Sequence, residues 1–343
     1  MGQMVYNVND SATQVLAAKQ VKENIFVDLV HKNGYGVTQH EETNVSTLRI
    51  MKVMPFTDDA RDLGATSNGA WFNNGDIDTP TVVEYDLNLL HLYDKSVDIP
   101  EVQQDMVAVS LMDNATKNIG GRAATEINAS TIAHQLTAVY NAADTAGAWT
   151  DIGSIVGADG DVYNAVQTAS TMLDDGDPAN GIQAFPFAER EIVMRPSFRA
   201  SLLSAKGVLI GGSNYAQSML AKGAVSPEAR KEWGNMYCGE IDGIPCYIAP
   251  AALWTRAGDW VGNATEFAAT QAIVCAASAT DRGISTQDYI KIIDSPTGAG
   301  KRLQPKTRWG VNVAYPKGIV PILANGTAAP TAQLTVVAPG SRA

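Results

Sequence analysis

The segment nearest to a known chemical motif in this sequence is Gly298-Ala299-Gly300-Lys301-Arg302. A loop that cradles phosphate carries a glycine five positions before the glycine that precedes its lysine, and a serine or threonine after the lysine to reach magnesium. Here the first of these positions is Ser295 and the last is Arg302. Because both requirements fail, we interpret the segment as a turn and not as a nucleotide site.

Histidines and cysteines offer little further chemistry. No histidine has a histidine or cysteine partner at ligand spacing, and the His-Glu-x-x-His motif is absent from the sequence. The three cysteines cannot all pair within one chain, which favours a reducing compartment, and we expect Cys238 and Cys246 to be buried beside a turn. The sequence therefore predicts no metal site, no cofactor and no catalytic residue, and favours a structural or binding protein over an enzyme.

The overall composition excludes further classes. Among 343 residues there are 25 basic and 36 acidic side chains, a formal net charge of −11, so the chain is a poor candidate for wrapping nucleic acid by charge. Hydrophobic residues make up 45% and charged residues 18%, which is typical of a globular chain. The N-terminus lacks the pattern of a signal peptide. The uncharged stretch from Gly318 to Ser341 is interrupted by prolines, so we expect a strand and a loose tail there instead of a membrane span.

Hydrophobic spacing predicts an N-terminal helix and then a long β-hairpin. From Ser11 to Val30 the apolar residues Ala18, Val21, Ile25 and Leu29 fall on one helical face. Thr47–Pro55 and Val82–Lys95 alternate as strands. One face of the first strand carries Leu48, Ile50 and Lys52, and one face of the second carries Val83, Tyr85, Leu87, Leu89, His91 and Tyr93.

The loop between the two strands, Asp58 to Pro80, has roughly two dozen residues, whereas hairpin loops usually have about 2–5. A long two-stranded arm buries too little surface to be stable alone. We therefore expect it to lie on another surface, which its own chain need not supply.

The remaining elements favour an α+β fold without a repeated βαβ unit. A helical region opens at Asp98 and runs to about Ala143, with an expected interruption at Gly120-Gly121 and a long helix from Arg122. Further helices are expected at Val162–Leu173, at Ser197–Ala205 and around Tyr215–Leu220. Further strands are expected at Glu191–Met194, on both sides of a turn at Asp242-Gly243, and at Gln271–Ala276, Tyr289–Ile293 and Gly310–Val320.

Charge is divided unevenly along the chain. Phe56 to Ile99 has a balance of −7, and Asp281 to Ala343 has a balance of +5. The ordinary interpretation is two differently solvated faces, and the sharper one is that the acidic arm lies on a basic surface of this subunit or a neighbour. The candidate contacts are Asp58, Asp59, Arg61, Asp62, Asp76 and Asp78 in the arm, and Lys301, Arg302, Lys306 and Arg308 near the C-terminus.

Taken in order, these parts resemble the major capsid proteins of tailed bacteriophages, which have the Hong Kong 97-type fold. The hairpin resembles the extended loop (E-loop) of that family, and RAATEINASTIAHQLTAVYNAA (Arg122–Ala143) is similar to its long spine helix. EREIVMRPSFRASLLS (Glu189–Ser204) and GEIDGIPCYIAPAALW (Gly239–Trp254) resemble its axial domain. RWGVNVAYPKGIVPI (Arg308–Ile322) resembles its closing strand.

The resemblance implies a division of the chain into five parts. These are an N-terminal arm and helix (1–46), the E-loop (47–99), a peripheral domain (100–145 and 282–322), an axial domain (146–281) and a C-terminal tail (323–343). Only about 45 residues precede the hairpin and the chain begins with methionine, so a separate scaffolding protein, or none, is implied.

The function implied is that of a structural protein, not an enzyme. The subunit would assemble with itself into pentamers and hexamers of an icosahedral shell in the host cytoplasm, and the virion capsid would enclose the phage genome without sequence-specific binding. Further expected partners are a scaffolding protein, a portal and a decoration protein, and no membrane is involved. The arm has no lysine between Lys52 and Lys95, so we expect no covalent lysine cross-link between subunits.

Two alternatives stay open at this point. An encapsulin-type nanocompartment would have the same fold and an enzyme cargo, although encapsulins are shorter and have a compact hairpin. An α+β enzyme with an unrecognised site is the other alternative, and it would be a discrete monomer or dimer with a deep pocket.

Overall fold

The computed structural model describes residues 11–53, 82–146, 161–178, 182–204, 234–261, 267, 269–287, 290–294, 300–324 and 334–338. Helices and strands mix without a repeating unit, so the predicted α+β class is confirmed. The predicted helix around Tyr215–Leu220 and the loop from Asp58 to Pro80 lie outside the described residues. No helix in the described ranges combines the length and the apolar character needed to cross a membrane.

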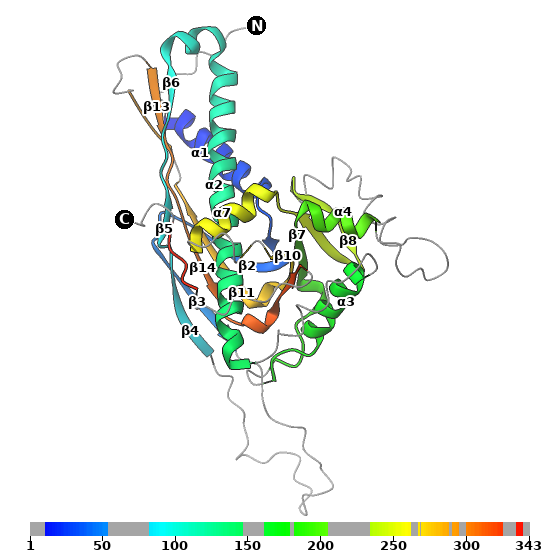
Figure 1. Ribbon diagram of the computed structural model, residues 1–343. Helices are drawn as coiled ribbons and strands as arrows, with labels where there is room; N and C mark the ends of the chain where they lie inside the picture. Colours follow the sequence, from blue (N-terminus) through cyan, green and yellow to red (C-terminus); the bar gives the residue numbers. More distant parts are fainter. Residues whose placement is uncertain are drawn as a thin grey trace, which may run out of the picture.

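A single helix, α2 (Glu101–Ala146), runs along the length of the molecule (Figure 1). It contacts α1 (Ser11–Val27) and α7 (Ala251–Val261), and strands from three sheets also pack on it. Many of its buried positions are alanines, which let neighbouring elements approach the helix axis closely. The predicted helix at Ser11–Val30 is confirmed, and its four expected core residues are all buried.

The expected break of the long helix at Gly120-Gly121 is wrong, because α2 continues through both glycines. A Cβ atom at Gly120 would lie 2.5 Å from Cβ of Asn24 and 3.1 Å from the backbone oxygen of Val21, both in α1. The glycine therefore allows two helices to touch and does not end either one. Asn128, two turns further along α2, accepts a hydrogen bond from Val30 N and donates one to Asp28 O, which ties down the end of α1.

The first sheet contains five strands in the order β1-β2-β11-β14-β5. They are β1 (Lys32–Asn33), β2 (Gly36–Thr43), β11 (Thr280–Thr286), β14 (Thr307–Val313) and β5 (His91–Tyr93). β11 pairs in parallel with β2 and antiparallel with β14, and all seven of its residues are buried. The sequence analysis did not predict β2 or β11, because TDRGIST carries charges and a glycine where a central strand would normally be apolar.

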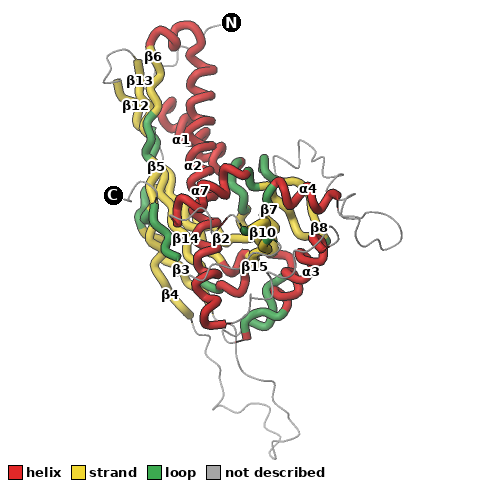
Figure 2. The backbone as a smooth tube through the Cα atoms, in the orientation of Figure 1, coloured by secondary structure: helices red, strands yellow, loops and turns green. Residues whose placement is uncertain are grey.

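The second sheet has the order β15-β10-β7-β9-β8. Its strands are β15 (Ile319–Leu323), β10 (Thr270–Ala276), β7 (Arg190–Met194), β9 (Ile244–Ile248) and β8 (Tyr237–Ile241). α3 (Asp161–Asp174) and α4 (Pro196–Ser204) contact it, and Figure 2 shows these helices beside its strands. The predicted turn is confirmed: Asp242 and Gly243 have φ of 52° and 83°, the left-handed pair that a two-residue hairpin requires.

A third sheet, β12-β13-β6, is antiparallel and lies beside the N-terminal half of α2 (Figure 1). Its strands are β12 (Lys291–Asp294), β13 (Gly300–Gln304) and β6 (Val97–Pro100). Two expectations fail here. The segment interpreted as a turn at Lys301-Arg302 is part of β13, and the long helix begins at Glu101, after Asp98–Pro100 have formed a strand.

Two stretches predicted as single strands each divide between two sheets. Val82–Lys95 contains β4 (Val82–Asn88), which pairs with β3 (Thr47–Val53), and β5, which joins the first sheet. In Gly310–Val320, β14 ends at Val313 and β15 begins at Ile319, with a 3-10 turn at Pro316–Gly318 between them. Alternation along the sequence cannot show such a change of sheet, because the side chains keep their period of two across it.

Candidate assembly surface

The hairpin stem, defined as β3 and β4, lies on the outer face of the first sheet. Its buried face carries Leu48, Ile50, Leu87 and Leu89, which form a separate apolar cluster. The alternation predicted for both strands is therefore confirmed. The surface beneath the stem belongs to its own chain, which the sequence analysis left open.

Two glycines make this close contact possible. Gly283 of β11 and Gly310 of β14 are direct cross-strand partners, and both face the stem. A Cβ atom at Gly283 would meet Leu48 at 2.6 Å, and one at Gly310 would meet the backbone oxygen of Asn88 at 2.3 Å. The pair leaves a flat area on the sheet, and the chain crosses over this area as it leaves β4.

A buried carboxylate next to this contact joins the stem to the sheet. Asp281 of β11 has a side chain with no exposed area, and its Oδ2 lies 2.5 Å from Nζ of Lys52 in β3. Tyr85 of β4 donates its hydroxyl hydrogen bond to the same oxygen, and Nε2 of His40 in β2 lies 3.2 Å from Oδ1. We call these four side chains the Asp281 cluster.

Burial alone would raise the pKa of Asp281, but the bonds from His40, Lys52 and Tyr85 lower it below the ordinary value. Burial and the neighbouring carboxylate raise the pKa of Tyr85, so its hydroxyl stays protonated and donates. This cluster was not predicted, although the sequence contains an indication of it. Lys52 and Tyr85 fall on the predicted apolar faces of the two strands, and a buried polar group requires a partner.

The opposite face of the first sheet carries a second polar cluster. His31 Nδ1 lies 2.9 Å from Oε1 of Glu191, and both side chains have no exposed area. Arg282, the residue after Asp281, donates to the backbone oxygen of His31 at 2.8 Å and to Oε1 of Gln39 at 2.6 Å. Because Glu191 belongs to β7, these contacts join the two large sheets. We call His31, Glu191 and Arg282 the inner cluster.

Burial sets the protonation states of the inner cluster. Burial, followed by the charge of Arg282, lowers the pKa of His31 to about 3, so this histidine is neutral at physiological pH. Burial lowers the pKa of Arg282 to about 10, which leaves the guanidinium charged. The cluster is an internal junction and not a reactive site, since none of its groups reaches solvent.

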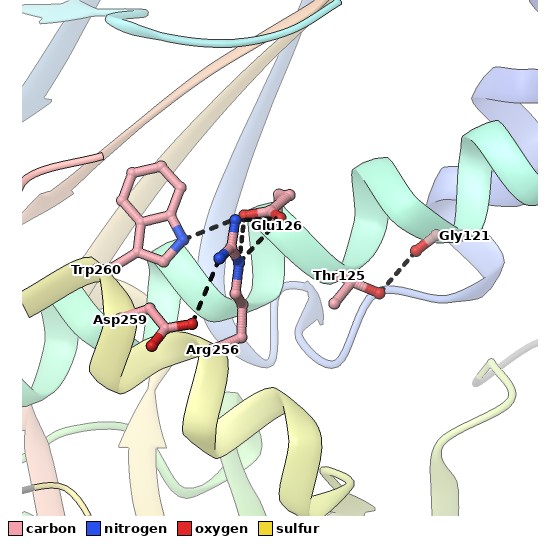
Figure 3. Close-up of polar contacts among 6 residues, drawn as sticks. All are labelled: Gly121, Thr125, Glu126, Arg256, Asp259 and Trp260. Atoms are coloured by element: carbon pink, nitrogen blue, oxygen red, sulfur yellow. Dashed lines mark hydrogen bonds and ion pairs between the residues drawn. The ribbon is translucent and has the colours of Figure 1, made fainter. Parts of the chain in front are cut away.

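Glu126 of α2 holds α7 in place. It accepts hydrogen bonds from Nε and Nη2 of Arg256 at 3.0 and 2.8 Å, and from Nε1 of Trp260 at 3.3 Å (Figure 3). The bonds to Glu126 raise the pKa of Arg256. Trp260 also packs against His91, whose pKa burial lowers to about 4. The sequence analysis did not predict α7, although its apolar residues recur at helical spacing.

The C-terminal segment is held by the same helices. Leu334 is buried, its backbone N–H donates to Oδ1 of Asn141 in α2, and its backbone oxygen accepts from Nδ2 of the same side chain. Val337 N donates to the backbone oxygen of Trp260. The expected loose tail therefore contains a docked segment, Leu334–Ala338, and the reason is the pairing of its backbone with the half-buried side-chain amide of Asn141.

The C-terminal cations named from the sequence fall into two pairs. Arg302 binds the carboxylate of Asp98 through Nε at 2.5 Å and Nη2 at 2.8 Å, and Lys301 lies 2.5 Å from Asp294. Both contacts join cross-strand partners in the three-stranded sheet β12-β13-β6. Lys306 and Arg308 are exposed, and no carboxylate of the described residues lies within ion-pair distance of either one.

Exposed apolar residues lie near Arg308 of the second pair. Leu92 of β5 is the cross-strand partner of Arg308, and it is 46% exposed. Leu90, just before β5, is 81% exposed. The six arm residues that the sequence analysis paired with these cations (Asp58, Asp59, Arg61, Asp62, Asp76 and Asp78) lie outside the described residues.

The predicted burial of Cys238 and Cys246 is confirmed. Cys238, Cys246 and Cys275 are free and buried, and burial raises the pKa of Cys238 to about 12. Within the described ranges, no group of three histidine, cysteine or carboxylate side chains is arranged to hold a metal ion.

No protein-family model matches the chain, and no curated protein matches it. Several solved structures are similar to it over most of its length. The head structure of Helicobacter pylori bacteriophage KHP40 has a TM-score of 0.49 at 12% identity, over 89% of this chain and 91% of that one. The mature capsid of bacteriophage PhiM1 has a TM-score of 0.47 at 11% identity, over 85% of this chain and 86% of that one. A virus-like particle from Pyrococcus furiosus has a TM-score of 0.45 at 10% identity, over 89% of this chain and 97% of that one.

Proposed function

We propose that this chain is a major capsid protein of the tailed-phage type, a subunit that assembles with copies of itself into a closed shell around a genome. The observation that carries the proposal is the order of parts along nearly the whole chain. A hairpin with a long tip precedes one 46-residue helix, and a strand–proline–helix unit and a two-residue hairpin at Asp242-Gly243 follow. This is the order that the sequence resemblance implies.

The hairpin arm, residues 47–99, is proposed as an assembly element. Its stem buries one apolar face against its own sheet. The tip has few apolar residues to anchor a core, so we infer that the subunit folds without it. The tip is acidic and has Arg61 as its only cation. An element of this kind is suited to a contact with a neighbouring copy.

Charge supports a particular receiving surface on that neighbour. Lys306 and Arg308 are exposed, and Arg308 is paired across the strands with the exposed Leu92, so an acidic segment with apolar residues would find both kinds of contact there. Lys301 and Arg302 would first have to leave Asp294 and Asp98. We therefore place Lys306 and Arg308 first among the four proposed cationic contacts.

The division into an N-terminal arm (1–46), E-loop (47–99), peripheral domain (100–145 and 282–322), axial domain (146–281) and tail (323–343) is part of the proposal. So are assembly in the host cytoplasm, a separate scaffolding protein, a portal and a decoration protein. The shell would be held without covalent cross-links, because the arm offers no lysine between Lys52 and Lys95.

Light scattering and electron microscopy of the purified full chain test the proposal. We expect closed particles, and particles boiled in detergent should run as one band near 36.3 kDa. Replacing residues 61–79 by a short Gly-Ser linker should leave a cooperatively folding subunit that assembles poorly. A native chain that stays below about 100 kDa under assembly conditions would contradict the shell, because stable shell contacts are expected to reach the size of specific interfaces. An enzyme cargo inside the particles would favour the nanocompartment alternative.

A further inference from the structure

We propose that Asp281 is a positioning residue for the hairpin arm: it sets the direction in which the stem leaves the sheet. The geometric part of this inference depends only on the structure. Its consequence for assembly rests on the proposed function.

The first step is that both strands of the stem are bonded to one acceptor. Lys52 on β3 and Tyr85 on β4 both reach Oδ2 of Asp281. Since the register pairs Lys52 with Val83 and Ile50 with Tyr85, the two donors are neighbours across the hairpin. Bonds from both strands to one acceptor oppose rotation of the ribbon about either strand.

Different contacts attach the stem to the sheet and orient it. The leucine cluster over Gly283 and Gly310 holds the stem by apolar contact, which is not directional and tolerates sliding. Charge-assisted hydrogen bonds are stronger than neutral ones and depend on geometry. The leucines therefore keep the stem on the sheet, and the Asp281 cluster determines its orientation.

The third step is that the acceptor itself is fixed. Asp281 lies in β11, the central strand of its sheet, and the next residue, Arg282, is bonded on the opposite face. Within the part of the chain that the structure describes, the groups that face Asp281 come from four strands and the segment after β14. They are His40 of β2, Lys52 of β3, Tyr85 of β4 and Asn312 of β14, which bonds Tyr85, with the ring of Tyr315 at 5.7 Å from Lys52 Nζ.

The same carboxylate is also the point where the stem can be released. His40 and Lys52 have side chains that are 32% and 22% exposed, so water can solvate them once the carboxylate is lost. The inner cluster has no such access. Removal of the Asp281 charge should thus free the stem without unfolding the subunit.

The test measures the stem direction in the full chain by electron–electron double resonance. One spin label is attached at Met51→Cys, on the exposed face of β3, and one at Lys291→Cys, which is exposed on β12. The labelled chains are diluted with unlabelled chains so that neighbours do not contribute. A sample without the two new cysteines checks that the three buried native cysteines stay unlabelled.

We expect one narrow distance distribution in the unaltered background, and a broader, shifted one in Asp281→Asn. The matched control is Glu84→Gln, which removes a stem carboxylate that bonds Arg49 at the surface, and it should leave the distribution unchanged. If Asp281→Asn does not fold, Tyr85→Phe and Lys52→Met remove one bond each and should each broaden the distribution. A distribution unchanged in all three variants would overturn the proposal.

Assembly gives the second readout. If about a tenth of the released stems point in the competent direction, the concentration needed for assembly rises about tenfold. Loss of assembly in Asp281→Asn with an unchanged distance distribution would also overturn the positioning role. A broadened distance distribution in Asp281→Asn, together with an unaltered chain that never forms shells, would contradict the proposed function but not the positioning role.

Discussion

The Asp281 cluster and the inner cluster are organised by two consecutive residues of β11 that point to opposite faces of one sheet. Arg282 is bonded among side chains with no exposed area, at the junction with the second sheet. Asp281 is equally buried, but two of its partners are in contact with solvent. The difference indicates that the contacts on the inner face of the first sheet are fixed, whereas the contacts on its outer face can be broken and re-formed. A buried charge that loses its partner cannot be solvated, whereas a rim charge can.

The largest effect should follow from breaking the inner cluster. Arg282→Met removes the cation beside Glu191 and His31, and we expect a loss of about 3–5 kcal/mol in the free energy of unfolding. Urea unfolding of the soluble subunit measures this loss. The control is Lys301→Met at the exposed pair with Asp294, which should cost under about 1 kcal/mol. Equal losses in the two variants would remove the distinction between buried and exposed pairs.

A smaller effect is expected where the stem crosses the sheet. In Gly310→Ala the new Cβ atom would meet the backbone oxygen of Asn88, and the stem must shift, at a cost of about 1–3 kcal/mol. Thermal and urea unfolding check this. The control is Gly121→Ala in the middle of α2, where the new methyl group would lie 3.2 Å from the flexible end of the Asp28 side chain. This change should leave the free energy of unfolding unchanged or raise it slightly. A stable Gly310→Ala protein would mean that the stem does not need this close approach.

The two clusters should lose their contributions to folding stability at different pH values as the solution is made more acidic. The unfolded chain protonates His31 below 6.5, whereas the folded chain resists until about pH 3, so folding stability falls as the pH drops from 6.5 toward 3. The slope from one such group is about 1.4 kcal/mol per pH unit. His91, with a pKa of about 4, adds to it with the same sign.

The pKa of Asp281 is lowered from 3.8, so its contribution is fully present above that pH and is lost only as the pH falls through the lower folded value. Urea unfolding at pH 7, 5.5 and 4 measures the overall slope. His31→Gln should reduce the slope between pH 6 and 4, while Asp281→Asn should not. Identical slopes in His31→Gln and the unaltered chain would contradict the assignment.

The smallest effect is expected on the exposed face of the stem. Arg49 and Glu84 form an ion pair with both side chains well exposed, so Arg49→Ala should change stability by less than about 1 kcal/mol. Lys52→Met, three residues further along the same strand, should cost more, because it leaves the buried carboxylate of Asp281 with one donor fewer. Thermal unfolding of the two variants side by side compares the two faces of one strand.

The sequence by itself determined the elements whose signals are local. The apolar side of α1, the alternating faces of the stem and the turn at Asp242-Gly243 all appear in the structure as predicted. Each depends on the periodicity or backbone preference of a short stretch, which no distant residue needs to supply. The absence of lysine from the arm tip is likewise a property of the sequence alone.

Only the tertiary structure shows what the glycines inside regular elements and the charged residues of β11 contact. Gly120, Gly283 and Gly310 lie in the interiors of regular elements because another backbone or side chain approaches them, and the approaching residue is distant in sequence. Asp281 and Arg282 look like surface residues of a loop, yet both are buried because their partners come from other strands. Such positions are specified by pairs of residues and not by neighbours along the chain, so local patterns could not reveal the Asp281 cluster or the change of sheet after β4.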